Sequence, residues 1–268
     1  MKTRIRTEKG QRRIVLLGIL FLGLGGARLG AQQLPFAVGE WPPYTGSKLE
    51  NGGMAAELVV AAARAAGMEA TLSFVPWRRA ESTVAAGRSF ATFPYQITEE
   101  REERYLFSDI LFTSRFIVAY RTGSLPERGA GYRGPEDFRG LLVGAVAGTD
   151  AVTRPLARAG VTAVEVQDPV QLVKMLEAGR LDFAIDDELV FARAQTEAAA
   201  QGISTLPEPF GNRCEFRLMA SLKYPGAEPL LERFNRGLSA IRESGEAAAI
   251  VGKYGTEGSP TPRDDRRF

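Results

Sequence analysis

The sequence contains no histidine and a single cysteine, Cys214, among its 268 residues. The absence of histidine excludes Ser-His-Asp triads, histidine general bases and histidine-ligated metal sites. A single cysteine excludes disulfides within the chain and zinc sites built from several cysteines, so we expect Cys214 to be a buried apolar residue. We therefore expect neither a metal nor a cofactor. The chemistry that remains is that of carboxylates, Arg and Lys, aromatic rings and hydroxyls.

Long hydrophobic runs are also scarce. The one that stands out, Ile14 to Gly26, follows six basic residues and precedes the small residues that end at Ala31. A helix of this length, at about 1.5 Å per residue, is too short for the roughly 30 Å hydrocarbon core of a membrane. The pattern predicts a secretory signal peptide at residues 1–31 and a periplasmic protein. An uncleaved anchor is the alternative, and cleavage after Ala27 rather than Ala31 stays open.

The positive charge of the chain lies mainly in this N-terminal segment. Residues 1–31 hold seven of the 34 Lys and Arg and one of the 32 Asp and Glu, which leaves 27 basic and 31 acidic residues and turns a net charge of +2 into −4. A mature chain of this charge gives no reason to expect a nucleic acid or an anionic membrane as a partner.

From Pro35 onward, short β-type runs alternate with amphipathic stretches bounded by Gly or Pro, which is typical of an α/β fold with parallel strands. We expect helices at 54–66, 76–86 and 99–104, from Asp150 with an interruption at Pro155, from Asp168, from Glu188 and along 230–241. The expected strands are 36–38, 71–75, 90–95, 107–112, 115–120, 141–146, 161–166, 181–185 and 214–222.

The Gly/Pro-rich segment 122–135 divides this series, and the returning strand from Cys214 brings the last helix back to the first half. We therefore predict a first lobe of residues 32–120, a second lobe of 121–213, a C-terminal part of the first lobe at 214–257 and a disordered tail at 258–268.

Four segments occur in the order that one known family shows. They are Gly39 to Tyr44, Thr98 to Arg101 with Phe107-Ser108-Asp109, Gly144 to Thr149, and Gly179 to Glu188. With these segments the chain resembles the extracellular solute-binding proteins of family 3, which serve polar-amino-acid ABC transporters. The resemblance implies the type II periplasmic-binding-protein fold, with two lobes that each hold a mixed sheet flanked by helices and are joined by two hinge crossovers. It also implies a small amino-acid-like ligand between the lobes, an ABC permease as partner and a monomer.

Arg101 stands in the first turn of a predicted helix, where a cation opposes the helix dipole. Its helical neighbours offer no acid, whereas Arg104 can pair with Glu100. In the family that the chain resembles, the arginine of this T-x-x-R pattern binds the ligand's α-carboxylate, which suits the forked guanidinium. A salt bridge within the first lobe is the alternative.

Asp186 and Asp187 end a predicted strand at the carboxyl end of a parallel sheet, where open α/β folds collect ligands. The resemblance implies that Asp187 takes the ligand's ammonium while Asp186 turns away into the structure. The alternative is that the pair caps the helix that follows.

The remaining candidates are aromatic or polar. The family places rings at the positions of Trp41, Tyr44 and Trp77 to sandwich the ligand side chain, with core packing as the alternative. Thr149 can offer a hydroxyl and an N–H to a carboxylate, and Asp150 either caps the next helix or demands a second positive charge on the ligand. Gln96 follows the unusual run Phe93-Pro94-Tyr95, where relatives have small hydroxyl residues, and we expect it to replace a hydroxyl contact.

Two other functions fit the same fold. Periplasmic cyclohexadienyl dehydratases, which act on prephenate or arogenate, use a carboxylic acid in this cleft, but they have glutamate where this chain has Asp187, so we expect no enzyme. A sensory ligand-binding domain normally continues into a transmembrane segment and a signalling module, and this sequence does not. A periplasmic subunit that docks onto a separate receptor stays open.

Overall fold

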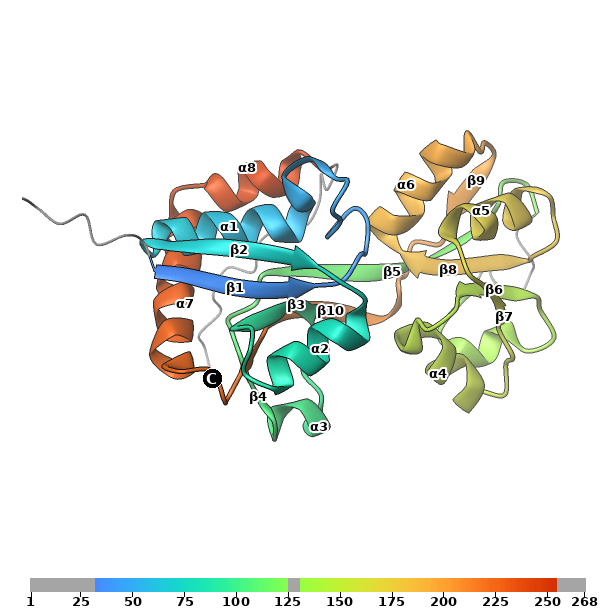
Figure 1. The fold of residues 1–268 in the computed structure, drawn as a ribbon. Helices are drawn as coiled ribbons and strands as arrows, with labels where there is room; N and C mark the ends of the chain where they lie inside the picture. Colours follow the sequence, from blue (N-terminus) through green and yellow to red (C-terminus); the bar gives the residue numbers. More distant parts are fainter. Residues whose placement is uncertain (1–31, 125–130, 255–268) are drawn as a thin grey trace, which may run out of the picture. The chain divides into compact units, whose positions relative to one another are not determined.

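The computed structural model describes residues 32–124 and 131–254, so the predicted signal peptide and C-terminal tail lie outside the described residues. The chain alternates strands and helices (Figure 1), and the α/β class is confirmed. Up to the Gly/Pro-rich segment the elements are β1 (Gln32–Val38), the 3-10 helix η1 (Glu50–Gly52), α1 (Met54–Ala65), β2 (Met68–Phe74), α2 (Trp77–Ala85), β3 (Ala91–Tyr95), α3 (Glu99–Glu102), β4 (Tyr105–Phe107) and β5 (Phe112–Arg121).

The elements that follow this segment repeat the alternation and end in two helices. They are the 3-10 helix η3 (Pro135–Phe138), β6 (Val143–Val146), α4 (Asp150–Arg158), β7 (Val164–Val166), α5 (Pro169–Glu177), β8 (Phe183–Asp187), α6 (Glu188–Ala198), β9 (Ile203–Thr205), β10 (Phe210–Ser221), α7 (Ala227–Glu243) and α8 (Glu246–Gly252).

The strands follow one hydrogen-bonded order, β2-β1-β3-β10-β5-β8-β6-β7, with β4 beside β10 and β9 beside β5. We call β1 to β4 the first strand group and β6 to β9 the second. Strand β10 pairs with β3 and β4 through Arg217 to Ser221, and with β5 through Phe210 to Phe216. The antiparallel β5 and β10 therefore connect the two groups (Figure 1). The lobe boundaries proposed from the sequence stay a prediction.

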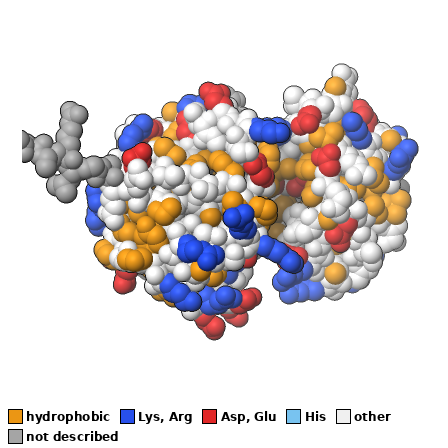
Figure 2. Space-filling view, in the orientation of Figure 1, with side chains coloured by type: hydrophobic (Ala, Val, Ile, Leu, Met, Phe, Trp, Pro, Cys, Tyr) orange, Lys and Arg blue, Asp and Glu red, His pale blue; other side chains and the backbone are white. Residues whose placement is uncertain are grey.

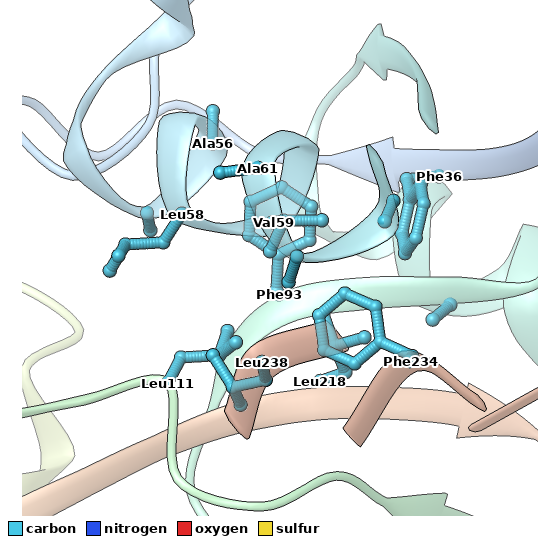
Figure 3. Close-up of a cluster of buried hydrophobic side chains, with 14 of the residues drawn as sticks. Phe36, Ala56, Leu58, Val59, Ala61, Phe93, Leu111, Leu218, Phe234 and Leu238 are labelled. Atoms are coloured by element: carbon cyan, nitrogen blue, oxygen red, sulfur yellow. The ribbon is translucent and has the colours of Figure 1, made fainter. Parts of the chain in front are cut away.

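The first strand group packs against α1 and α7. Helix α1 is rich in alanine and presents Leu58 and Val59 to Phe93 of β3 and to Phe234 and Leu238 of α7 in one buried cluster (Figure 3). Alanine favours the helix and lets neighbouring elements approach closely. The loop residue Tyr44 belongs to the same cluster.

Strand β8 is buried on both faces in the second strand group. Phe183 and Ile185 lie in one buried cluster, and Ala184 lies in another with residues of α5 and α6. Burial on both faces explains the uninterrupted apolar run before Asp186 and Asp187, which is typical of a central strand in a parallel sheet. The two aspartates consequently stand at the carboxyl end of the strand.

Two local predictions were wrong. Helix α4 continues through Pro155, because buried Val152 and Leu156 anchor the turns on either side and offset the one ladder hydrogen bond that proline removes. Strand β10 begins at Phe210 rather than Cys214, since its first residues pair with β5 across an irregular register that local pattern does not reveal.

Among the helices of residues 32–124 and 131–254, none has both the length and the apolar character needed to cross a membrane.

Close packing of α7 on α1 predicts a specific sensitivity at Gly237. A Cβ atom on this residue would lie 2.1 Å from the carbonyl oxygen of Ala62, so Gly237→Ala must push the helices apart. We expect a loss of about 1–3 kcal/mol in the free energy of unfolding, measured by urea denaturation. Gly252→Ala, in α8, is the control, because a Cβ there meets nothing within 4 Å. Equal losses in the two variants would contradict the close packing.

Candidate functional site

A cavity of about 1180 Å³ lies where the two strand groups face each other, and residues of both line it. In the first half of the chain, before residue 125, the lining residues belong to the loop after β1, the start of α2, the end of β3, and α3. From the second half they come from the loop after β6, from α4, the start of α5, the end of β8, and α6. Phe116 of β5 and Phe216 of β10 complete the lining. The space-filling view shows basic side chains gathered over α2 and α3 on one side of the hollow (Figure 2).

Aromatic rings form much of the wall on the side of the first strand group. The Trp77 ring lies against the backbone of Gly39, where an added Cβ would come within 2.1 Å of the ring. Its centroid is 5.7 Å from that of Tyr95, and Trp41 lies 5.2 Å from Phe216. Rings held against backbone and against one another form an apolar wall that offers ring faces on which a ligand side chain can stack. Trp41 and Trp77 thus line the cavity as expected for ligand contacts, and that role stays a prediction.

Arg101 lies on the cavity wall with about a third of its side chain exposed. One guanidinium N–H donates to the carbonyl oxygen of Gln96 at 3.2 Å, and the guanidinium carbon lies 4.8 Å from the centre of the Tyr95 ring. Glu81 of α2 is 3.9 Å away, at the outer limit of an ion pair. These contacts orient Arg101 and, among the described residues, use only one of the guanidinium's five N–H donors in a hydrogen bond, so a planar anion in the cavity can still bind to this group.

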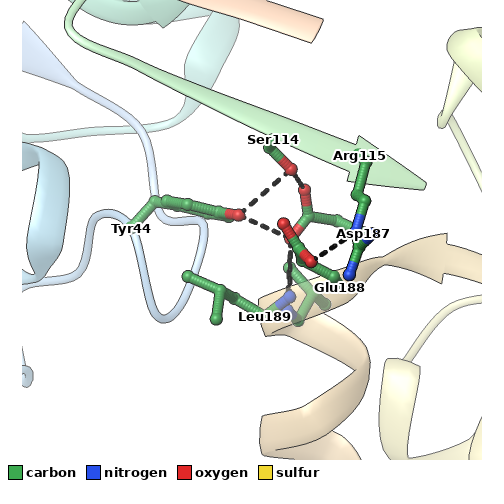
Figure 4. Close-up of polar contacts among 7 residues, drawn as sticks. Tyr44, Ser114, Arg115, Asp187, Glu188 and Leu189 are labelled. Atoms are coloured by element: carbon green, nitrogen blue, oxygen red, sulfur yellow. Dashed lines mark hydrogen bonds and ion pairs between the residues drawn. The ribbon is translucent and has the colours of Figure 1, made fainter. Parts of the chain in front are cut away.

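Asp187 lies in a buried polar network between the two strand groups (Figure 4). Its Oδ1 accepts hydrogen bonds from the Tyr44 hydroxyl at 2.6 Å and from the backbone N–H groups of Leu189 and Val190, while the Ser114 hydroxyl donates to Oδ2. The carboxylate is therefore also the N-cap of α6. Burial raises the pKa of Asp187 to about 6, although the hydroxyl and backbone donors act in the opposite direction.

Asp186 belongs to the cavity lining, and Asp187 does not. The structure thus differs from the expected orientation of the pair, whereas a role of Asp187 in binding a ligand stays a prediction. Asp187 turns back over the first turn of α6 as its cap, and strand alternation then directs Asp186 to the opposite side. Oδ1 of Asp186 accepts the N–H of Asp187 at 2.8 Å, whereas its buried Oδ2 has no partner among the described residues. Burial, and to a lesser degree the negative charge of Asp187, raise the pKa of Asp186 to about 7.

Of the other predicted ligand residues, some line the cavity and one lies in the buried core. Gln96, Thr149 and Asp150 line the cavity, whereas Tyr44 is 1% exposed and belongs to the core and to the Asp187 network. The backbone N–H of Thr149 already donates to the Val146 carbonyl oxygen at 3.2 Å. Asp150 is the first residue of α4 rather than its N-cap, and it pairs with Arg154 at 2.6 Å. A local ion pair thus serves this acid in place of the expected cap, and the alternative of a second positive charge on the ligand stays a prediction.

Sequence reasoning missed several lining residues. Phe116 and Phe216 come from β5 and β10, whose pairing joins distant parts of the chain. Tyr95 was noted only as an unusual residue after a strand, and its position at the end of β3 was the available signal. Cys214 is half-buried beside a second cavity rather than fully buried. Within the described ranges no cluster of three or more Cys, Asp or Glu side chains is suited to a metal ion.

The buried network predicts that the Tyr44 hydroxyl matters for stability. Tyr44→Phe removes a donor from a buried carboxylate and should lower the free energy of unfolding by about 1–3 kcal/mol. Tyr224→Phe is the control, since Tyr224 packs by its ring on Phe90 and its hydroxyl makes no hydrogen bond within the described part. If both variants unfold at the same urea concentration as the wild type, the network does not stabilise the fold.

The raised pKa values predict how stability depends on pH. An acid that keeps its proton to higher pH in the folded chain than in the unfolded chain stabilises the fold fully below pH 4, and that stabilisation is lost as the pH rises through about 7 for Asp186. The free energy of unfolding of Asp186→Asn should therefore match that of the wild type near pH 4 and exceed it at pH 8 by on the order of 4 kcal/mol. Denaturation curves at the two pH values test this, and a difference that does not change with pH would contradict it.

Comparisons with known proteins agree with this architecture. A histidine kinase sensor domain with similarity to periplasmic binding proteins is 22% identical over 86% of this chain and 99% of that chain, with a TM-score of 0.68. An ancestral arginine-binding protein bound to arginine is 22% identical over 84% and 99%, with a TM-score of 0.65. The second substrate-binding domain of Lactococcus lactis GlnP in its open conformation is 22% identical over 83% and 95%, with a TM-score of 0.62.

At these identities the structural matches show the fold alone, and a search of curated proteins gives no significant match. A family model, that of the bacterial extracellular solute-binding proteins of family 3, matches residues 36–257. The match confirms the family resemblance and the prediction of a solute-binding protein, and the structural matches agree with the type II periplasmic-binding fold. The chain therefore belongs to the bacterial extracellular solute-binding proteins of family 3.

Proposed function

We propose that the chain captures a small amino-acid-like solute in the cavity and delivers it to an ABC permease. The observation that carries this proposal is the position of Arg101 on a cavity wall built from aromatic rings. Among the described residues its guanidinium donates a single hydrogen bond, so its other N–H groups can bind a ligand. Solved structures with this fold include proteins bound to arginine, to glutamine and to glutamate.

Arg101 supplies the group that distinguishes an amino acid from an apolar solute. Its fork can bind both oxygens of an α-carboxylate through charge-assisted hydrogen bonds. Trp41 and Trp77 then stack on the ligand side chain, and Gln96 and Thr149 supply polar contacts from opposite sides of the cavity. Because the ligand touches both strand groups, its binding favours the arrangement in which they enclose it.

This function requires export of the protein, which the N-terminal segment would direct. Cleavage of the predicted signal peptide, residues 1–31, releases a monomeric protein into the periplasm. That location matches the extracellular family to which the chain belongs.

A second candidate is a ligand-sensing subunit for a membrane receptor, and one observation favours it. A histidine kinase sensor domain is among the similar structures, with a TM-score of 0.68. The two functions share the cavity and differ in the membrane partner. Cross-linking of the secreted protein in its own cells, followed by mass spectrometry, decides between them, because recovery of a kinase rather than a permease favours the sensor.

The proposal predicts that at least one L-α-amino acid raises the melting temperature of the mature protein. A ligand at 100 times its Kd stabilises the fold by about 2.7 kcal/mol, or roughly 5–10 °C for a chain of this size. We expect Arg101→Gln to abolish the shift. Arg104→Gln is the control, because Arg104 does not line the cavity and pairs with Glu100, so its variant should keep the shift.

This experiment screens the twenty amino acids one at a time by differential scanning fluorimetry. A full shift in the Arg101 variant would exclude carboxylate binding by this residue. A panel in which no compound shifts the wild type would refute the proposed function.

A further inference from the structure

A second cavity, of about 730 Å³, lies beside β10, and residues from both halves of the chain line it. Gln96, Phe116 and Ala151 line this cavity and the first one, so the two cavities are neighbours. The groups proposed to bind the solute, Arg101 and the tryptophan rings, line the first cavity and not the second. The second cavity therefore has no assigned occupant.

Much of the wall of the second cavity is apolar and held in place by the core. Three rings line it, those of Phe116, Tyr132 and Phe210, and each is at most 8% exposed. The Tyr132 ring stacks on that of Phe138, with centroids 5.0 Å apart. The lining also includes three prolines, Pro135, Pro155 and Pro209. This wall can hold the apolar body of a ligand through contacts with the rings.

The charged groups around the second cavity favour an anion. Three arginines and two glutamates line it, an excess of one positive charge, whereas three arginines and five acids line the first cavity. Arg217 is already committed, since it donates to Glu215 at 2.8 Å and to the carbonyl oxygen of Ser108 at 2.9 Å. Its buried Nε has no hydrogen-bond partner in the described part of the chain, and an anion nearby would offset the cost of that lost hydration.

Arg133 and Arg213 carry the positive charge that is not committed. Arg133 precedes η3, Arg213 belongs to β10, and both are exposed. Within residues 32–124 and 131–254 neither guanidinium forms a hydrogen bond or an ion pair, and this includes Glu208, the other acid of the lining. A guanidinium in this state presents a planar fork of donors that matches a carboxylate.

We propose that the second cavity binds a small organic carboxylate, with its anion on Arg133 and Arg213 and its apolar body against the rings of Tyr132 and Phe210. This inference adds a ligand site beside the solute cavity and does not depend on the identity of the solute. Charge-assisted hydrogen bonds from the guanidiniums hold the carboxylate. A neutral or cationic molecule of the same shape gains the ring contacts but not these bonds.

Cys214 makes this site testable, because it is the single cysteine of the chain and lines the second cavity but not the first. Its thiol is half-buried, so a ligand in the cavity shields it from alkylation. The rate of its reaction with uncharged iodoacetamide is measured on the mature protein with phenylacetate, phenylacetamide or phenethylammonium as the probe. We expect phenylacetate alone to slow the reaction, by about tenfold at roughly ten times its Kd.

Three variants locate the probe, and each rate is expressed as a ratio with and without phenylacetate so that the thiol's own reactivity cancels. Arg213→Gln should raise the Kd of phenylacetate about tenfold. Arg193→Gln is the matched control, because it changes an exposed arginine of α6 outside both linings, and it should be protected as the wild type is. Arg101→Gln alters the first cavity and leaves the second complete, so protection should persist.

Calorimetric titration of phenylacetate measures the same Kd without the thiol, and melting temperatures check that the variants fold. Absence of protection by phenylacetate, equal protection by phenylacetamide or phenethylammonium, or undiminished protection in Arg213→Gln would overturn the inference. Loss of protection in Arg101→Gln would also overturn it, since the probe would then lie in the first cavity. All of these results leave the proposed function intact, because the panel of amino acids tests it separately.

Discussion

Burial of two adjacent carboxylates at the end of β8 is the constraint around which this structure is organised. Asp187 can be buried only because Tyr44, Ser114 and the first N–H groups of α6 surround it with donors. These donors come from a loop of the first half, from a connecting strand and from a helix of the second half. Leu189 and Val190, next to the capped turn, accordingly pack into the core cluster of the first strand group.

Local sequence patterns predicted much of the fold. They did not predict features that depend on contacts between residues far apart in the chain. Apolar periodicity located most helices and strands, and the position of Arg101 against a helix dipole singled out one of the cations that line the cavity. The network around Asp187 was not predictable, because Tyr44 and Ser114 lie 143 and 73 residues away along the chain. Which of the two aspartates faces the cavity depends on which of them caps α6. The choice is set in part by Tyr44 and Ser114, which donate to Asp187 from distant parts of the chain.

The cavity is asymmetric in chemistry, which bears on selectivity. The first half contributes Arg101 and most of the rings, and the second half contributes Asp186 and the turn that contains Thr149. A solute with a carboxylate and a flat or apolar side chain matches both Arg101 and the rings.

The most direct test of this account is a crystal structure of the mature protein with the solute that it retains through gentle purification. The account predicts a carboxylate on the Arg101 guanidinium and a solute side chain against the rings of Trp41 and Trp77, with Asp187 still held by Tyr44 and Ser114. A solute that leaves the Arg101 guanidinium without an anionic partner would contradict it.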